Sequence, residues 1–320
     1  MKILVVGLGV IGTTYAYLFE KAGHEVEHLI RKSSDKRDIK MLDIDLLDGR
    51  TAKQGVMTSD VYDVKHCSQK EYDFIFVSVP SGKIGNVVKS LDDLHIKGTI
   101  ILACGIWKNK ESLDALMSGH DYVLGYPVAG GHCTLTHLEA CVFDHFMLEK
   151  EEKTAIPNYA DLERLFSDCR IQLEKPYDML EWIWLHMAIN AAVVSVAGKY
   201  GDVSQPSASA EKLMNSSASL KQAVLAIRET SAIIAARGVL LKHYRNELLA
   251  YRLPTFISVP LMKNMFAKNI LTRKIMTLHG NIDDLLFVCQ SVYDCGKANH
   301  VKAPLFYDCC QAVLSVKKTK

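Results

Sequence analysis

Six residues near the start of the chain suit phosphate binding by type and spacing: Gly7, Leu8, Gly9, Val10, Ile11 and Gly12, a GxGxxG sequence. They follow an apolar run over 2–6, typical of a buried strand, and they open a helical pattern over Val10–Lys21. In such a turn the three glycines permit a tight bend, backbone approach to a pyrophosphate and close helix packing. Free N–H groups at the helix start favour phosphate. The sequence therefore predicts a dinucleotide site; the alternative is a tight turn without a ligand.

The residues after the second expected strand, Glu25–Ile30, indicate which dinucleotide binds. NAD enzymes usually place Asp or Glu at this point to bind the ribose hydroxyls. Here the strand is followed by Arg31 and Lys32. A guanidinium can hold a phosphate by two hydrogen bonds, and an ammonium adds a point charge. We therefore expect NADPH rather than NADH; the alternative is a pair of solvated surface cations.

A second candidate for chemistry is a run of apolar residues that carries polar groups. Residues 182–198 include no formally charged residue. The length of this uncharged run is close to that of a membrane helix. His186, Asn190 and Ser195 would be costly in lipid, so we favour a buried core helix and no membrane contact. His186 and Asn190 are four residues apart and share one helix face. They need partners there, from a ligand or, in the alternative reading, from the core.

The elements that must position these groups are predicted by two different sequence patterns, one in each half of the chain. Apolar runs typical of strands occur at Tyr72–Val79, Thr99–Ala103 and Tyr122–Gly125, and they alternate with helical patterns such as Ile84–Leu94. This alternation predicts an α/β domain over 1–175 with a parallel, doubly wound, Rossmann-type sheet. From 176 to 320 we expect an all-helical domain. Its long helical patterns are Met179–Tyr200, Leu220–Arg237, Ile282–Asn299 and Leu305–Val316.

Composition excludes several classes of protein. The length of 320 residues suggests about two domains, and 49% hydrophobic with 23% charged residues excludes a disordered chain. Because 38 basic residues face 36 acidic ones, we expect no nucleic-acid partner. The nine cysteines include no CxxC pair, so we expect no disulfide framework and a cytoplasmic location. His132, Cys133 and His137 lack a fourth ligand at a sensible spacing, so we expect no metal.

In the order of its motifs the chain resembles the ketopantoate reductase family, the 2-dehydropantoate 2-reductases. The likeness covers nearly the whole chain. It rests on KILVVGLGVIG followed by Arg31, then YDFIFVSVPSGKIGNVVKSL, TIILACG, WLHMAINAAVVSVAG, LAIRETSAIIAARGV and ANHVKAP. The resemblance implies a Rossmann domain joined to a helical domain, an oxidoreductase that uses NADPH, and pairing into a homodimer. It also implies a small α-keto acid as substrate, reduced at its carbonyl to a 2-hydroxy acid.

In the second half, the chain departs from the family's pattern. His186 stands where the family has its catalytic lysine, and Asn190 keeps the asparagine four residues later. The family's next asparagine is Val194 here. The family's C-terminal glutamate, which faces cofactor and substrate, falls near Asp283 or Asp284. These departures favour a related reductase with a different substrate.

In the first half, two differences from the family's pattern lie on the expected cofactor side. Pro80 replaces the lysine that the family usually has after its YDFIFVSV-type strand, and Lys83 is a substitute one turn along. Cys104 and Gly105 replace an Asn-Gly pair after the TIIL-type strand. A glycine-rich segment that includes Gly130 would bring backbone close to the nicotinamide; the alternative for it is an ordinary loop.

The resemblance and the histidine together suggest a mechanism. Hydride transfer to a ketone builds negative charge on the carbonyl oxygen, and a proton donor there lowers the barrier. Histidine suits this at neutral pH. We expect His186 to protonate the oxygen, Asn190 to bind the substrate, and Asp284 to orient His186 or the ribose. Two alternatives stay open: opine-dehydrogenase-like joining of a keto acid to an amine, and an NADPH-binding sensor without chemistry.

Overall fold

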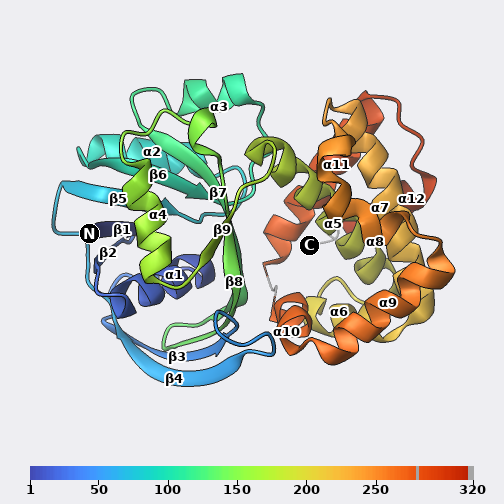
Figure 1. Cartoon of the computed structure of the whole chain (residues 1–320), viewed down its shortest axis with the longest axis horizontal. Coiled ribbons are helices and arrows are strands. Elements are labelled where there is room, and N and C mark those ends of the chain that lie inside the picture. The colour runs from blue at the N-terminus through green and yellow to red at the C-terminus, as the bar shows by residue number, and fades with distance from the viewer. Residues whose placement is uncertain (279–280, 316–320) are drawn as a thin grey trace. The chain divides into compact units, whose positions relative to one another are not determined.

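The computed structural model describes residues 1–278 and 281–315 of the chain. The chain divides into two compact units, Met1–Leu180 and Glu181–Lys320, which are considered separately here (Figure 1). The boundary expected from the sequence, between 175 and 176, falls in the segment that leads into the first long helix of the second unit.

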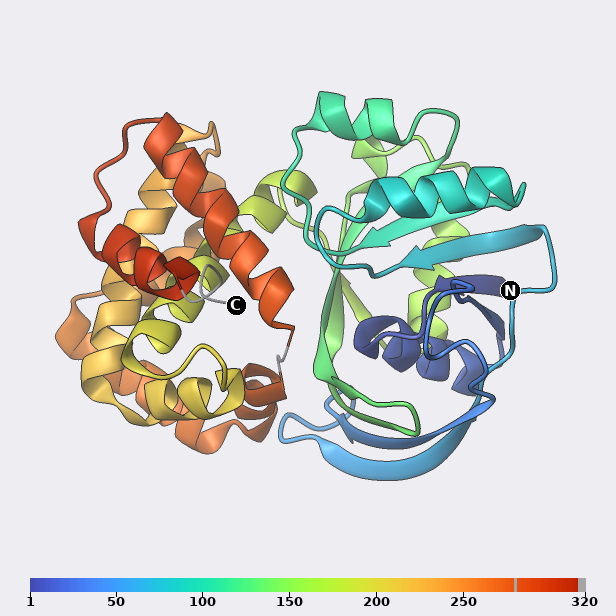
Figure 2. The same cartoon turned by 180° about the vertical axis from the view of Figure 1, so that it is seen from behind.

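The first unit is built on one large sheet. Its strands are β1 (Lys2–Val6), β2 (Glu25–Leu29), β3 (Met41–Asp48), β4 (Val56–Asp63), β5 (Glu71–Val77), β6 (Lys97–Ala103), β7 (Tyr122–Cys133), β8 (His137–Leu148) and β9 (Gln172–Glu174). Its helices are α1 (Val10–Lys21), α2 (Ile84–Asp93), α3 (Lys110–Leu116), α4 (Tyr159–Asp168) and the short 3-10 helix η1 (Glu151–Lys153). The α4 helix lies in front of the sheet in Figure 1, whereas α2 lies in front of it when seen from behind in Figure 2.

The strands are ordered β2-β1-β5-β6-β7-β8-β3-β4, with β9 beside β8. The first five strands of this order are parallel to one another. From β1 the chain first runs to β2 on one side and later to β5 on the other. A reversal of this kind leaves a crevice at the carboxyl ends of the two strands, where open α/β sheets bind ligands. The prediction of a Rossmann-type α/β domain is thus confirmed.

The rest of the sheet corrects the expectation of a wholly parallel sheet. β8 runs antiparallel to β7, and β4 runs antiparallel to β3. The predicted strand Tyr122–Gly125 is too short, because the glycine-rich segment after it continues as β7 to Cys133. A Cβ at Gly131 would lie 2.4 Å from the Glu139 carbonyl oxygen and 2.8 Å from Val10 Cγ1. Glycine therefore serves here to let β7 pass close to β8 and to the start of α1.

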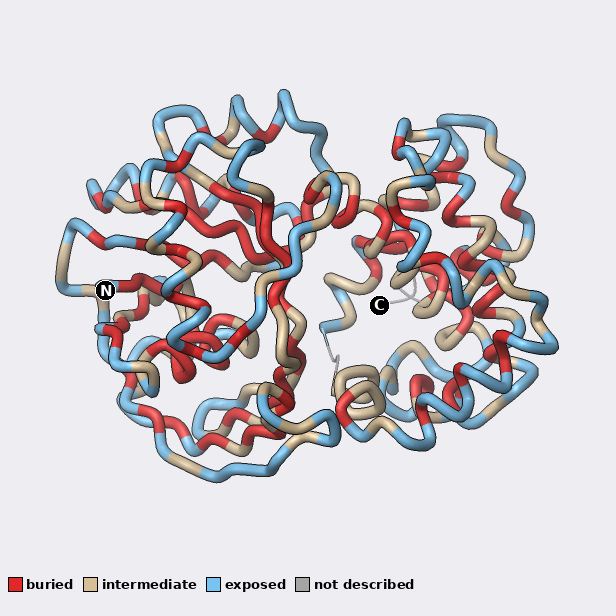
Figure 3. The backbone as a smooth tube through the Cα atoms, in the orientation of Figure 1, coloured by how far each residue is buried: buried red, intermediate tan, exposed pale blue. Residues whose placement is uncertain are grey.

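Aromatic rings form the centre of the core on one face of the sheet. Tyr15 and Phe19 on α1 pack against Phe76 of β5, and Phe146 of β8 stacks on Phe166 of α4 with ring centroids 4.5 Å apart. All five side chains are buried. Figure 3 shows the buried residues of this unit concentrated along its strands. This packing fixes α1, and with it the turn that precedes α1, on the sheet.

The second unit is helical, as the sequence predicts. Its helices are α5 (Met179–Tyr200), α6 (Pro206–Asn215), α7 (Ser217–Ala236), η2 (Leu241–Tyr244), α8 (Arg245–Arg252), α9 (Thr255–Lys268), α10 (Ile270–Leu278), α11 (Ile282–Ala298) and α12 (Pro304–Ser315), of which α5 begins in the last residues of the first unit. The last residue of the predicted helix Leu305–Val316 lies outside the described residues. Within the described residues, α5 alone has the length and hydropathy of a membrane span. Most of the apolar stretch of α5 is buried inside the protein.

The close approach at Gly12 predicts a stability effect. A Cβ at Gly12 would lie 2.9 Å from Val5 Cγ1 and 3.0 Å from Ser78 Oγ, whereas a Cβ at Gly9 would meet nothing within 4 Å. Overpacking of this kind costs roughly 1–3 kcal/mol. We expect Gly12→Ala to lower the free energy of unfolding in urea by about that amount, and Gly9→Ala to change it much less. Equal effects of the two substitutions would contradict this packing.

Glu149, directly after β8, is a buried carboxyl in the first unit. Its Oε2 accepts a hydrogen bond from the Leu124 N–H at 3.0 Å. Burial raises the pKa of Glu149 from its ordinary 4.5 to about 7, although the Leu124 hydrogen bond acts in the opposite direction. The folded chain therefore holds this proton more tightly than the unfolded chain does.

This raised pKa predicts how stability changes with pH. The contribution of the Glu149 proton to stability is complete below pH 4.5 and is lost as the pH rises through about 7. We expect Glu149→Gln to remain close to the unsubstituted protein at pH 4.5 and to be more stable at pH 8, by roughly 2 kcal/mol in urea unfolding. Glu71→Gln, at an exposed position, serves as the control. A Glu149→Gln difference that stays constant from pH 4.5 to 8 would refute the assignment.

Candidate functional site

The GxGxxG turn has the geometry that its sequence predicts. Gly7 has φ +88°, in the left-handed region that favours glycine. Its N–H donates to the Leu29 carbonyl of β2 at 2.9 Å. Gly9 is open to the surroundings, and Gly12 packs closely against β1 and against Ser78, after β5. The turn therefore lies at the carboxyl ends of β1 and β5, in the crevice of the sheet.

The start of α1 is suited to an anion. Gly9 is the N-cap residue and offers no side-chain cap, and the first turn of α1 includes no acidic residue. The first N–H groups of a helix have no partner within it, and they carry the positive end of the helix dipole. A pyrophosphate against this turn would meet these N–H groups without a competing carboxylate. The residues present thus fit the phosphates of a dinucleotide.

Two side chains hold carbonyl groups of the turn, and sequence reasoning missed both. His28 Nδ1 lies 2.8 Å from the Gly7 carbonyl oxygen, and its Nε2 lies 2.8 Å from Tyr62 Oη. Lys36 Nζ donates to the Leu8 carbonyl at 3.0 Å and to the Cys133 carbonyl at 3.2 Å. A signal for His28 was available, because it is the one polar residue on the inward face of the expected strand Glu25–Ile30.

Burial makes His28 neutral at physiological pH. Its side chain is almost wholly enclosed, and burial lowers its pKa to about 4, although the hydrogen bond with Gly7 acts in the opposite direction. Tyr62 is also fully buried, and burial raises the pKa of its hydroxyl. Both groups therefore act as neutral hydrogen-bonding partners.

The predicted cofactor cations follow β2. Arg31 and Lys32 are exposed in the segment between β2 and β3. Lys36 lies in the same segment, and its contacts with Leu8 and Cys133 tie this segment to the turn. The structure thus brings the two cations and the GxGxxG turn into one neighbourhood of the first unit.

The other predicted cofactor residues lie on adjacent strands. Pro80 is exposed after β5, and Cys104 is buried with Gly105 after β6. Because β1, β5 and β6 are parallel neighbours, these positions share the sheet edge that carries the turn. Gly130 is in the interior of β7, opposite Cys141, rather than at a strand end or in a loop.

In the second unit, α5 carries two of the predicted catalytic residues. His186 and Asn190 lie one turn apart, and both are partly exposed. The His186 ring stacks on Trp182, with ring centroids 4.9 Å apart and an interplanar angle of 10°. The stack orients the imidazole, and the residue is partly exposed.

The third predicted catalytic residue, Asp284, lies in the first turn of α11. Its N–H donates to the Asn281 side chain, which caps the helix. α11 packs against α5, where buried Ser195 Oγ lies 3.6 Å from Cys289 Sγ. Asp284 thus belongs to a helix that contacts the helix of His186.

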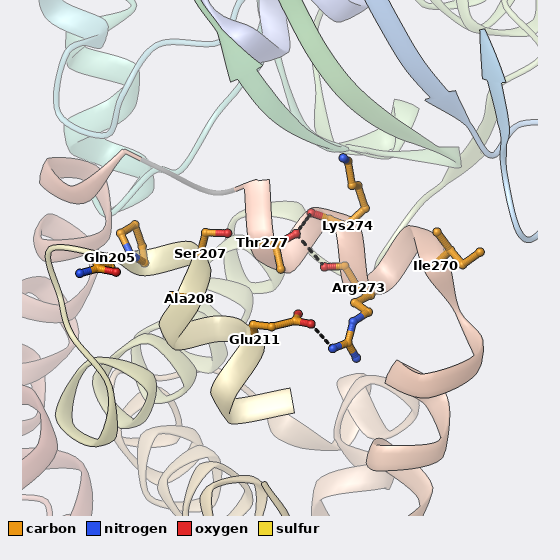
Figure 4. A pocket seen from close by; sticks show the side chains of 9 residues that line it. Gln205, Ser207, Ala208, Glu211, Ile270, Arg273, Lys274 and Thr277 are labelled. Atoms are coloured by element: carbon orange, nitrogen blue, oxygen red, sulfur yellow. Dashed lines mark hydrogen bonds and ion pairs between the residues drawn. The ribbon is translucent and has the colours of Figure 1, made fainter. Parts of the chain in front are cut away.

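None of the predicted residues lines the groove between α6 and α10. This groove has a volume of about 630 Å³. Figure 4 shows Glu211 and Arg273 pointing toward one another to form an ion pair across it. The Thr277 hydroxyl donates to the backbone of α10.

Disulfide bonds and clusters of metal-binding side chains are absent from the described parts of the chain. All nine cysteines are free thiols. Among residues 1–278 and 281–315, no group of three His, Cys, Asp or Glu side chains could hold a metal ion.

Comparison with known proteins supports the reading of the first unit. Residues 3–130 match the sequence profile of the family "Ketopantoate reductase PanE/ApbA". The chain is also similar to a prephenate dehydrogenase of Lactococcus lactis subsp. cremoris, with 31% identity over 136 residues, or 41% of this chain. The chain spans only 35% of the length of that curated relative.

Solved structures share the fold over the whole chain. A PanE/ApbA family ketopantoate reductase from Ralstonia eutropha has a TM-score of 0.69 at 14% identity, and a dimeric ketopantoate reductase from Staphylococcus aureus has 0.63 at 12%. D-mandelate dehydrogenase with NADH and anilino(oxo)acetate has 0.65 at 13%. Each comparison covers 100% of this chain and 99% of the other. As the resemblance in the sequence implies, residues 3–130 match the ketopantoate reductase PanE/ApbA family, and the whole chain has the fold of solved ketopantoate reductases.

Proposed function

We propose that the protein is an NADPH-dependent oxidoreductase that reduces the carbonyl of a small α-keto acid to a 2-hydroxy acid. The observation that carries this proposal is the GxGxxG turn, with its open Gly9 and uncapped helix start at the switch point of the sheet. The family match over 3–130 and the solved ketopantoate reductases of the same fold support it. D-mandelate dehydrogenase, another structure of this fold, was solved with NADH.

The preference for NADPH rests on the segment after β2. The ribose of a dinucleotide bound at such a turn lies near the end of the second strand. This chain presents Arg31 and Lys32 there, both exposed and able to reach a 2′-phosphate. Lys36 donates a hydrogen bond to the Leu8 carbonyl, and this contact holds the segment that carries the two cations beside the turn.

Replacing Arg31 should change the cofactor preference. Loss of a charge-assisted hydrogen bond costs about 1.5–3 kcal/mol, which is at least tenfold in affinity. We expect Arg31→Ala to raise the Kd for NADPH about tenfold or more and to leave the Kd for NADH within about twofold, measured by calorimetric titration. Arg37→Ala, an exposed cation of the same segment, is the matched control. Equal losses for NADPH and NADH would remove Arg31 from the 2′-phosphate site.

His186 is the proposed proton donor. NADPH, if bound at the turn, would supply a hydride, and negative charge would then develop on the carbonyl oxygen of the substrate. A neutral-pH acid such as an imidazolium can deliver the proton to that oxygen. Stacking on Trp182 sets the plane of the ring. Asn190, one turn along the same face, would bind the substrate, and Asp284 would orient the imidazole or the ribose.

Replacing His186 should lower turnover without weakening cofactor binding. General acid catalysis contributes about 10²–10⁴ in rate. We expect His186→Ala to lower kcat by a factor in that range, followed by NADPH absorbance, while the Kd for NADPH stays within about twofold. His120→Ala, which loses a hydrogen bond to Asp92 in the first unit, is the control. Unchanged kcat in His186→Ala would exclude it as the acid.

One assay separates the proposed reaction from its alternatives. NADPH oxidation is followed with a panel of α-keto acids, with and without added amines. Turnover with a keto acid alone supports the proposed reductase. Turnover only with an amine would replace it by opine-type reductive condensation. Tight NADPH binding without turnover across the panel would replace it by a sensor. A homodimer and a cytoplasmic location also stay predictions.

A further inference from the structure

We propose that His28, held by Tyr62, is a positioning residue for dinucleotide binding: it fixes the Gly7 carbonyl and thereby aims the backbone N–H groups of the turn at the cofactor. This inference rests on the proposed function of the GxGxxG turn. It concerns two side chains, from β2 and β4, that no motif of the sequence analysis includes. Neither residue touches the proposed phosphate position, so both would act through the backbone of the turn.

The hydrogen bonds define the protonation state of the His28 ring. The Gly7 carbonyl can only accept, so Nδ1 of His28, at 2.8 Å, must carry a proton. In the neutral imidazole Nε2 then has a free lone pair, which accepts from the Tyr62 hydroxyl at 2.8 Å. The Gly7 carbonyl thus sets the tautomer, and the Tyr62 hydroxyl holds the ring in place by donating to its other nitrogen.

Because of the geometry of the peptide group, fixing the Gly7 carbonyl also sets the direction of the next N–H group. The carbonyl of Gly7 and the N–H of Leu8 belong to one trans peptide, in which the two groups point in opposite directions. Holding the Gly7 oxygen toward His28 therefore turns the Leu8 N–H away from it. The N–H of Gly7 is also fixed, by the Leu29 carbonyl of β2. Residues 28 and 29 thus hold the peptide groups on both sides of the Gly7 Cα.

Lys36 holds the next peptide in the same way. Its ammonium donates to the Leu8 carbonyl at 3.0 Å, which directs the Gly9 N–H to the opposite side. The carbonyls of Gly7 and Leu8 belong to consecutive peptides, so the directions of the Leu8 and Gly9 N–H groups are fixed before any ligand binds. Preorganised donors of this kind bind an anion without the cost of ordering them.

Packing alone does not account for the polar pair. His28 and Tyr62 lie within the apolar core of the first unit, and their rings meet edge to face with centroids 5.7 Å apart. An apolar pair would fill the same space without the desolvation of an imidazole and a hydroxyl, which burial makes costly. A buried polar network of this kind specifies one arrangement of the groups it joins. Here the network of His28 and Tyr62 holds the GxGxxG turn.

The test compares cofactor affinity across four substitutions at pH 7.5, measured by calorimetric titration of the full chain with NADPH. His28→Leu removes the donor, and His28→Asn keeps an N–H donor near the position of Nδ1. Tyr62→Phe removes only the hydroxyl that donates to His28 Nε2. Tyr159→Phe is the matched control. Its buried hydroxyl, also in the first unit, donates to the Glu149 carbonyl directly after β8, which is not part of the GxGxxG turn.

We expect His28→Leu to raise the Kd for NADPH about tenfold, because the N–H groups of an unheld turn must be ordered when the cofactor binds. His28→Asn should recover most of this loss, and Tyr62→Phe should raise the Kd about threefold. The control should lower thermal stability as Tyr62→Phe does, with an unchanged Kd. Rescue by His28→Asn is a result that a purely structural role would not give.

The outcomes separate this inference from the proposed function. If the unsubstituted protein binds neither NADPH nor NADH, the proposed function fails and this inference fails with it. If it binds NADPH and Tyr62→Phe and His28→Leu bind equally well, this inference alone is overturned. Should His28→Leu fail to fold, an unchanged Kd for Tyr62→Phe is enough to overturn it.

Discussion

The close approach of α1 to β1 at Gly12 is the contact on which the proposed site depends. Because no side chain separates the helix from Val5 and Ser78, the helix start is held directly over the carboxyl ends of β1 and β5. The buried rings of Tyr15 and Phe19 fix the rest of α1 on the sheet. The turn before α1 therefore has a set position, and the directions of its N–H groups follow from the carbonyl contacts of its first residues.

The parts of the fold that could be predicted have strong local patterns. A buried parallel strand is a continuous apolar run, and a core helix has a regular spacing, so β1, α1 and α5 match their predicted bounds. β4 could not be found in this way, because its residues are mostly exposed and half of them are polar. β7 was cut short because its glycines are typical of loops, although here they permit close contact with β8 and α1.

The candidate site could likewise be predicted only where its residues form a local sequence pattern. The GxGxxG turn and the cations after β2 are local in sequence, and they could be predicted as a group. His28 and Lys36 act on the carbonyls of Gly7 and Leu8, 21 and 28 residues away, and such partners are set only by the folded chain. His186 and Asn190 could be paired by helical spacing, but their chemistry came from the family resemblance. Their roles stay proposals.

The central claim is that the N–H groups of residues 8–12 bind the phosphates of a nicotinamide dinucleotide. The most direct measurement is the amide chemical shifts of isotopically labelled protein during titration with NADPH. We expect the amides of residues 8–12 to shift most within the first unit, with a titration curve that fits one NADPH bound per chain. Saturation with NADPH that leaves these amides unchanged, while amides elsewhere in the chain shift, would contradict it.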